Sequence, residues 1–404
     1  MTVSRWLAVG AAATALTGVA AAVIFARGTH APDSPADSKI STRPASAVEP
    51  GSNHRAPRLP YFAGVDGLRA LAVIAVVLYH TGLGWMPGGF LGVEVFFVIS
   101  GYLITSILLR ERERSGKMDL RRFWMRRARR LLPAVFVLIL SVLVYAVVFL
   151  PEEVAKLRSE SLAAIGYVSN WYQIFRDQSY FESLGRPSLF LHLWSLAVEE
   201  QFYLLWPALF ALVFAKIRAR HAVVALVAIA AASTVLMAIQ YQPGVDSSRI
   251  YYGTDTRAAG LLIGAALALV WAPGRLPASV ISASHRTADT YGLLALGGLI
   301  AFSALITESD RLLYQGGFAI VALLTALVIA AAVHPGARTL QSILGWRPLV
   351  WIGLRSYSIY LWHWPVFMVT RPHEDVALDG VLLLALRLAL TLTLAELSYR
   401  LVER

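Results

Sequence analysis

An arginine and a histidine lie eleven residues apart in the apolar stretch GVDGLRALAVIAVVLYH, residues 64–80. Ionisable side chains are costly in hydrocarbon and are rare in membrane helices unless they have a function. Because eleven residues make about three helical turns, Asp66, Arg69 and His80 share one stripe, with His80 about 16 Å deeper than Arg69. An imidazole titrates near neutrality and can accept a proton from a hydroxyl group. The spacing indicates a buried general base at His80, and a histidine that only hydrogen-bonds to a neighbouring helix is the alternative.

Carboxylates and a serine interrupt two other apolar segments. Glu94 and Ser100 lie in GGFLGVEVFFVISGYLIT, whose glycines permit close helix packing. Glu199 and Glu200 lie in LHLWSLAVEEQFYLLWP and point about 100° apart on a helix. Since burying adjacent carboxylates is expensive, we expect at least one of them to face polar groups.

A dense cluster of arginines opens the apolar segment that follows residue 130. Its members are Arg126, Arg127, Arg129 and Arg130. The planar guanidinium group binds phosphate bidentately, so the cluster is suited to gripping several phosphates. Loop charge that sets membrane orientation without any ligand is the other interpretation.

A late apolar segment, RSYSIYLWHWPVF, places Tyr360 and His363 on one helix, with a tryptophan on either side of the histidine. These tryptophans fit interfacial anchoring at least as well as stacking against a substrate.

The composition defines the class of protein. Of the 404 residues, 57% are hydrophobic and 15% are charged, whereas a soluble domain has about one-quarter charged residues. The net charge of +11 comes from 36 lysines and arginines, and no cysteine is present. Disulfides, thiolate metal sites and a cysteine acyl-enzyme are therefore excluded. We also predict no metal, because no His, Asp and Glu set has ligand spacing within one helix, although ligands from several helices remain open.

Recurring apolar runs of about 20 residues predict an all-α integral membrane protein. Residues 1–27 form an N-terminal hydrophobic segment, read as an extra transmembrane segment or a signal peptide, and residues 28–60 form a disordered linker. Residues 61–404 form a ten-helix transmembrane bundle. Its predicted spans are 66–83, 88–109, 131–150, 190–214, 221–240, 257–272, 289–307, 312–333, 349–369 and 380–400.

Loop charge predicts the orientation of these spans. The arginine-rich loop 110–130 contains ten lysines and arginines and is therefore expected in the cytoplasm. Residues 160–185 are apolar but broken by Ser, Asn and Gln, and we interpret them as a re-entrant or interfacial segment.

The motifs GVDGLRALAVIAVVLYH, GGFLGVEVFFVISGYLIT, RRARRLLPA, HLWSLAVEEQFY and SYSIYLWHWPVF occur in an order that resembles the acyltransferase-3 family of bacterial membrane O-acyltransferases. The resemblance covers about residues 60–404. It implies a plasma-membrane enzyme that uses cytoplasmic acyl-CoA, most often acetyl-CoA, to acylate hydroxyls of cell-envelope or exported glycans.

The resemblance also assigns roles to residues. The family's basic residue and histidine fall on Arg69 and His80, its Arg-x-x-Arg pair on Arg127 and Arg130, and its acidic and aromatic run on residues 199–203, which end at Tyr203. The family often has aspartate where Glu94 stands. The resulting predictions are catalysis by His80, Arg69, Glu199 and Glu200; donor binding by Arg126, Arg127, Arg129 and Arg130; and substrate binding by Asp66, Ser100, Tyr203, Tyr360 and His363.

The expected partners are membrane lipid, acyl-CoA and a glycan or glycolipid acceptor, with no nucleic acid. Relatives often continue past the VER tail into an extracytoplasmic hydrolase-like domain, so this chain is either a stand-alone form or a chain cut before that domain. Transient acylation of His80 fits the same residues as direct transfer. A transporter or flippase, and an acyltransferase for a small molecule such as a macrolide, are the rival functions.

Overall fold

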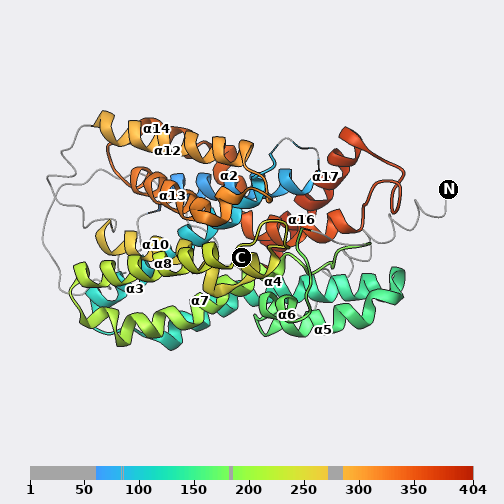
Figure 1. The fold of residues 1–404 in the computed structure, drawn as a ribbon, viewed down its shortest axis with the longest axis horizontal. Coiled ribbons are helices and arrows are strands. Elements are labelled where there is room, and N and C mark those ends of the chain that lie inside the picture. Colours follow the sequence, from blue (N-terminus) through green and yellow to red (C-terminus); the bar gives the residue numbers. More distant parts are fainter. Residues whose placement is uncertain (1–60, 83, 85, 182–184, 272–284, 404) are drawn as a thin grey trace, which may run out of the picture. The chain divides into compact units, whose positions relative to one another are not determined.

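The computed structural model describes residues 61–82, 84, 86–181, 185–271 and 285–403, which are almost entirely helical and contain no strand (Figure 1). The predicted N-terminal segment and linker, residues 1–60, lie outside the described residues. Within the part of the chain that the structure describes, nine helices, some together with an adjoining short turn, are long and apolar enough to cross a membrane. They are α2 (Ala63–His80), α3 (Gly92–Ser115), α4 (Leu120–Phe149), α7 (Leu193–Leu212), α8 (Ala219–Gln240), α10 (Thr254–Val270), α12 (His285–Leu305), α13 (Phe318–Ala332) and α17 (Gly380–Ser398). The prediction of an all-α multi-pass membrane protein is therefore confirmed.

The predicted span 349–369 is divided into two shorter helices, α15 (Arg347–Leu354) and α16 (Ser356–Met368). They meet at Arg355, whose φ of −104° and ψ of 2° are not helical. The Arg355 guanidinium group forms an ion pair with Glu396 of α17 and lies 4.1 Å from the centre of the Trp351 ring. The interruption in the helix coincides with this anchored arginine, which hydropathy alone does not reveal.

Two further short helices occupy the segment that was predicted to be re-entrant. Helix α5 (Val154–Ile165) and helix α6 (Ser169–Phe175) have 12 and 7 residues. At 1.5 Å per residue neither reaches across a hydrocarbon core of about 30 Å. The segment therefore does not cross as a single helix, as the sequence indicated.

Glycines allow the helices that carry polar side chains to approach backbone to backbone. A Cβ on Gly67 of α2 would lie 1.8 Å from the Leu344 carbonyl oxygen of α14 (Arg338–Leu344). A Cβ on Gly353 of α15 would lie 1.8 Å from the Asp66 carbonyl oxygen. Helix α2 therefore packs backbone to backbone against α14 at Gly67 and against α15 at Asp66.

The contact between α3 and α10 gives a test of this packing. A Cβ on Gly101 would lie 2.0 Å from the Leu261 carbonyl oxygen, so Gly101→Ala must push the two helices apart. We expect a loss of about 1–3 kcal/mol in unfolding free energy, as for other overpacked sites. The matched control is Gly297→Ala in α12, where no atom lies within 4 Å of the new Cβ. It should be neutral or stabilising by up to about 1 kcal/mol. Thermal unfolding in detergent, followed by circular dichroism, measures both, and equal melting temperatures would contradict the packing argument.

A buried ion pair joins the same two helices. Arg257 of α10 lies 2.9 Å from Glu94 of α3, with side chains 0% and 2% exposed. The guanidinium carbon also lies 3.8 Å from the centre of the Phe318 ring and 5.1 Å from that of Tyr251. Glu94 is thus part of the packing between helices rather than of a solvent-filled pocket near Ser100.

Removing one partner of this pair should be severe. We expect Arg257→Met to cost about 3–5 kcal/mol, because it leaves the Glu94 carboxylate buried and unpaired. The double variant Glu94→Met, Arg257→Met should recover much of this loss, since no uncompensated charge remains. Chemical denaturation of the purified protein in micelles compares the three forms. A double variant less stable than Arg257→Met would show that the ion pair is not the source of the effect.

Candidate functional site

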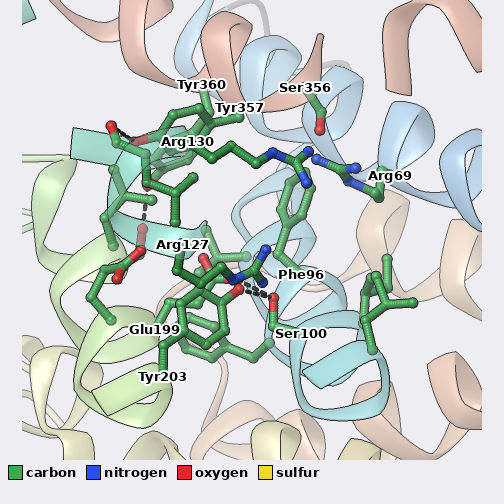
Figure 2. A pocket seen from close by; sticks show the side chains of 18 residues that line it. Arg69, Phe96, Ser100, Arg127, Arg130, Glu199, Tyr203, Ser356, Tyr357 and Tyr360 are labelled. Carbon is green, nitrogen blue, oxygen red and sulfur yellow. Dashed lines mark hydrogen bonds between the residues drawn. The ribbon is translucent and has the colours of Figure 1, made fainter. Parts of the chain in front are cut away.

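A pocket with about 830 Å³ of empty volume, part of it open to solvent, lies between α2, α3, α4, α7 and α16. Figure 2 shows its side chains converging from these helices. Its walls combine apolar side chains with a dense set of polar ones. The polar lining residues are Arg69, Ser100, Arg127, Arg130, Ser195, Glu199, Glu200, Tyr203, Ser356, Tyr357 and Tyr360. The pocket therefore brings together eight of the side chains singled out from the sequence.

Three guanidinium groups give the pocket its positive charge. Arg69 and Arg127 lie close enough to Arg130 to repel its positive charge. The Arg69 guanidinium group also lies 3.4 Å from the Asp66 carboxylate. Among the described residues, no carboxylate forms an ion pair with Arg127 or Arg130. Arg127 Nε is buried without a hydrogen-bond partner in the described part of the chain. Such a cluster is suited to an anion that bridges the arginines.

The two adjacent carboxylates face this cluster. Ser100 donates a hydrogen bond to Glu199, and the Tyr203 hydroxyl donates to Glu199 Oε1 at 2.5 Å. The Arg127 guanidinium carbon lies 4.4 Å from the centre of the Tyr203 ring. The expectation that at least one carboxylate faces polar groups is thus met at Glu199. Glu200 also lines the pocket.

Five predicted residues lie outside the pocket lining: Arg126, Arg129, Asp66, His80 and His363. Arg126 is 3.7 Å from Glu111 with a side chain 49% exposed, and Arg129 is exposed. Asp66 is buried where α2 meets α15. The pocket lining thus includes Arg127 and Arg130 but not Arg126 or Arg129, so the structure divides the predicted group of four arginines.

A separate cluster surrounds His80 at the far end of α2. His80 Nδ1 lies 3.3 Å from His363 Nε2, and His80 Nε2 lies 3.2 Å from the Tyr180 hydroxyl. The centre of the Trp364 ring is 4.8 Å from that of His80, with the rings edge to face. Since Arg69, Glu199 and Glu200 line the pocket and do not contact this cluster, the four predicted catalytic residues do not form one group.

His363, which was predicted to bind substrate, does not line this pocket. It is completely buried, and both ring nitrogens are occupied, by His80 and by the Tyr360 carbonyl oxygen at 2.7 Å. The sequence placed Tyr360 and His363 on one helix. The position of their side chains relative to His80 depends on how α16 packs against α2, which the sequence does not show.

Tyr360 connects the pocket with the histidine cluster. Its hydroxyl lines the pocket and lies 2.6 Å from Ser195 Oγ, and it donates to the His192 carbonyl oxygen at 2.9 Å. Its own carbonyl oxygen accepts from His363. The sequence reasoning missed Ser195 and Tyr180, since neither belongs to a charged or regularly spaced motif.

Two polar networks hold the loops beside the histidine cluster. Ser188 donates to Glu160, and the Ser188 carbonyl accepts from Trp364 at 2.8 Å. Burial raises the pKa of Glu160 above its usual value, and the bond from Ser188 offsets part of this. Burial also disfavours the charged form of Asp375, yet hydrogen bonds from Arg371 and Arg186 lower its pKa.

Chemically, the arrangement combines an arginine-lined pocket with an imidazole about three turns away on one helix. The described residues contain no group of three or more His, Cys, Asp or Glu side chains placed to hold a metal. These features fit group transfer from an anionic donor.

Comparison with known proteins identifies the family. Residues 62–399 match the acyltransferase domain of the Acyl_transf_3 family. The chain is 47% identical over 345 residues to the peptidoglycan O-acetyltransferase OatA of Listeria monocytogenes, covering 85% of this chain and 55% of that protein. It is 43% identical over 359 residues to the putative peptidoglycan O-acetyltransferase YrhL of Bacillus subtilis, covering 87% and 56%. Identity to the O-acetyltransferase OatA of Staphylococcus aureus is 40% over 343 residues, covering 85% and 57%.

No solved structure shows significant similarity to the chain. The chain spans about half the length of the curated relatives that it matches. The family match covers most of the described residues, including the pocket and the histidine cluster, and it confirms the resemblance found in the motifs. This chain belongs to the acyltransferase-3 family of membrane acyltransferases.

Proposed function

We propose that this chain transfers an acetyl group from cytoplasmic acetyl-CoA to a hydroxyl group of a cell-wall glycan. The observation that carries the proposal is the pairing, along α2, of an arginine pocket at Arg69 with a histidine cluster at His80. The printed names of the relatives support O-acetylation and a peptidoglycan acceptor. Because ten lysines and arginines lie in residues 110–130, the pocket opens toward the cytoplasm in this proposal.

In this proposal, the negative charge and the length of the donor determine how it binds along α2. Its phosphates bind Arg127, Arg130 and Arg69, which line the pocket together. A pantetheine arm is about as long as five extended residues, or roughly 17 Å, which matches the rise of about 16 Å from Arg69 to His80. The lining of the pocket includes Tyr360 and Ser195 but not His80. Donor binding therefore separates the Tyr360 and Ser195 hydroxyls to let the thioester reach the histidine.

In the transfer step, the acetyl group passes from the thioester sulfur to the acceptor oxygen. The acceptor hydroxyl gives its proton to His80 Nε2 as its oxygen attacks the thioester carbonyl carbon. The carbon–sulfur bond then breaks, and the leaving thiolate takes up the proton held by His80 Nε2, which gives free CoA and restores the neutral imidazole. Glu199 and Glu200 bind and orient groups in the donor pocket. The two-step variant, in which His80 Nε2 carries the acetyl group before the hydroxyl arrives, uses the same residues.

Release of CoA thiol by the detergent-purified protein tests the proposal. Because the chain has no cysteine, a thiol reagent reports free CoA without a protein background. We expect release from acetyl-CoA that increases when a soluble peptidoglycan fragment is added, with acetyl ester recovered on the fragment. Retention of labelled acetyl on quenched protein without acceptor would favour the two-step variant. No thiol release with any acyl-CoA would overturn the enzyme assignment and favour the transporter.

A further inference from the structure

We infer that His363 is a positioning residue that fixes the ring tautomer of His80, so that the His80 lone pair lies on Nε2. The inference rests on the proposed role of His80 as base and adds a second residue to that role. It follows from the order of hydrogen bonds in the histidine cluster.

The order begins at a group that can only accept. His363 Nδ1 lies 2.7 Å from the Tyr360 carbonyl oxygen, three residues earlier on α16. A carbonyl oxygen has no hydrogen to give, so His363 Nδ1 must carry one. Among the described residues, no carboxylate contacts His363 or His80. Since a charged imidazole with no counter-ion is costly in a buried site, both rings are neutral and His363 Nε2 carries a lone pair.

This lone pair decides the tautomer of the next ring. His80 Nδ1 lies 3.3 Å from His363 Nε2, and two lone pairs do not attract, so His80 Nδ1 carries the hydrogen. His80 Nε2 is then the basic nitrogen. It lies 3.2 Å from the Tyr180 hydroxyl, which donates to it. The Tyr180 hydroxyl thus marks the position from which an acceptor hydroxyl would give its proton.

The arrangement also supports the product of proton transfer. When His80 Nε2 takes a proton, its Nδ1–H continues to donate to His363, and that bond becomes charge-assisted and stronger. In a Ser-His-Asp triad the orienting group is a carboxylate. Here a neutral imidazole does the same work, itself held in orientation by the Tyr360 carbonyl. The other described aromatic groups packed on the two rings are His192, Trp364, Tyr79, Tyr360 and Phe367, none of which is an acid or a lysine.

Two substitutions at position 363 separate positioning from packing. In His363→Gln the side-chain carbonyl oxygen can still accept from His80 Nδ1, whereas His363→Leu fills the space without an acceptor. We expect His363→Leu to lower kcat about 100-fold or more and His363→Gln to recover at least a tenth of the wild-type rate. The KM for acetyl-CoA should stay unchanged in both, because the donor pocket is untouched. Equal losses in the two variants would overturn the inference.

Nitrogen-15 NMR of histidine-labelled protein in lipid bilayers reads the tautomer directly. The chain has nine histidines, and the His80 signals are those that disappear in His80→Gln. We expect a neutral ring with hydrogen on Nδ1 in the wild type and in His363→Gln, and a shift toward hydrogen on Nε2 in His363→Leu. Hydrogen on Nε2 in the wild type would overturn the inference even if neither variant folds. The expected tautomer together with an active His80→Ala protein would instead overturn the proposed function and leave the positioning intact.

Discussion

Replacing His80 by alanine is expected to lower the rate of acetyl transfer by about 10²- to 10⁴-fold, the usual contribution of a general base. The affinity for acetyl-CoA should change little, because His80 is not among the residues that line the donor pocket. CoA release and acetyl ester formation measure the rate, and equilibrium binding of labelled acetyl-CoA measures the affinity. The loss should appear in kcat rather than in KM, since His80 acts on the reacting atoms.

A second histidine of the same chain serves as the control. His221 of α8 is exposed and belongs to neither the pocket nor the histidine cluster, so His221→Ala should retain the wild-type rate. If His80→Ala turned over acetyl-CoA with acceptor as fast as His221→Ala does, His80 would be a structural histidine. Glu199 and Glu200 would then be the next residues to test.

Replacing Arg127 or Arg130 by alanine is expected to weaken acetyl-CoA binding by about 10- to 150-fold. This corresponds to about 1.5–3 kcal/mol for a hydrogen bond to a charged group. Both side chains line the pocket, and neither forms an ion pair with a carboxylate among the described residues. Binding of the wild type should also weaken as salt rises, because phosphate contacts from partly exposed arginines are screened.

Arg129 is the matched control for these variants, since it lies on the same helix and is exposed outside the pocket. Arg129→Ala should change the dissociation constant less than threefold. Comparable losses at 129 and 130 would instead favour donor binding by all four of the arginines that the sequence groups together.

The sequence predicted the helices that carry the site better than the grouping of its residues. Helical spacing correctly related Arg69 to His80 because both lie on one helix, where 1.5 Å per residue fixes their separation. It did not show that Glu199 and Glu200 belong with Arg69 rather than with His80. That grouping depends on the depth at which α7 packs against α2, and no local pattern encodes it.

Other differences have causes that hydropathy ignores. The tertiary packing around α4 brings Arg127 and Arg130 into the pocket lining without Arg126 and Arg129, although positive charge alone groups all four. Arg355 divides a predicted single span because its guanidinium pairs with Glu396, a residue 41 positions later. Tyr180 approaches His80 across 100 residues of chain, so only the tertiary structure could reveal it.

The contacts of Gly67 and Gly353 with neighbouring backbone atoms have a further consequence for donor choice. Because these contacts leave no room for side chains, α2 cannot slide along α14 and α15 when a donor binds. The distance along the helix axis between Arg69 and His80 is therefore constant, because it is set by eleven residues of helix. A thioester on a shorter arm can engage the arginines or reach the imidazole, but not both at once. In the proposed mechanism, the length of α2 therefore selects among acyl carriers as much as the chemistry of the pocket does.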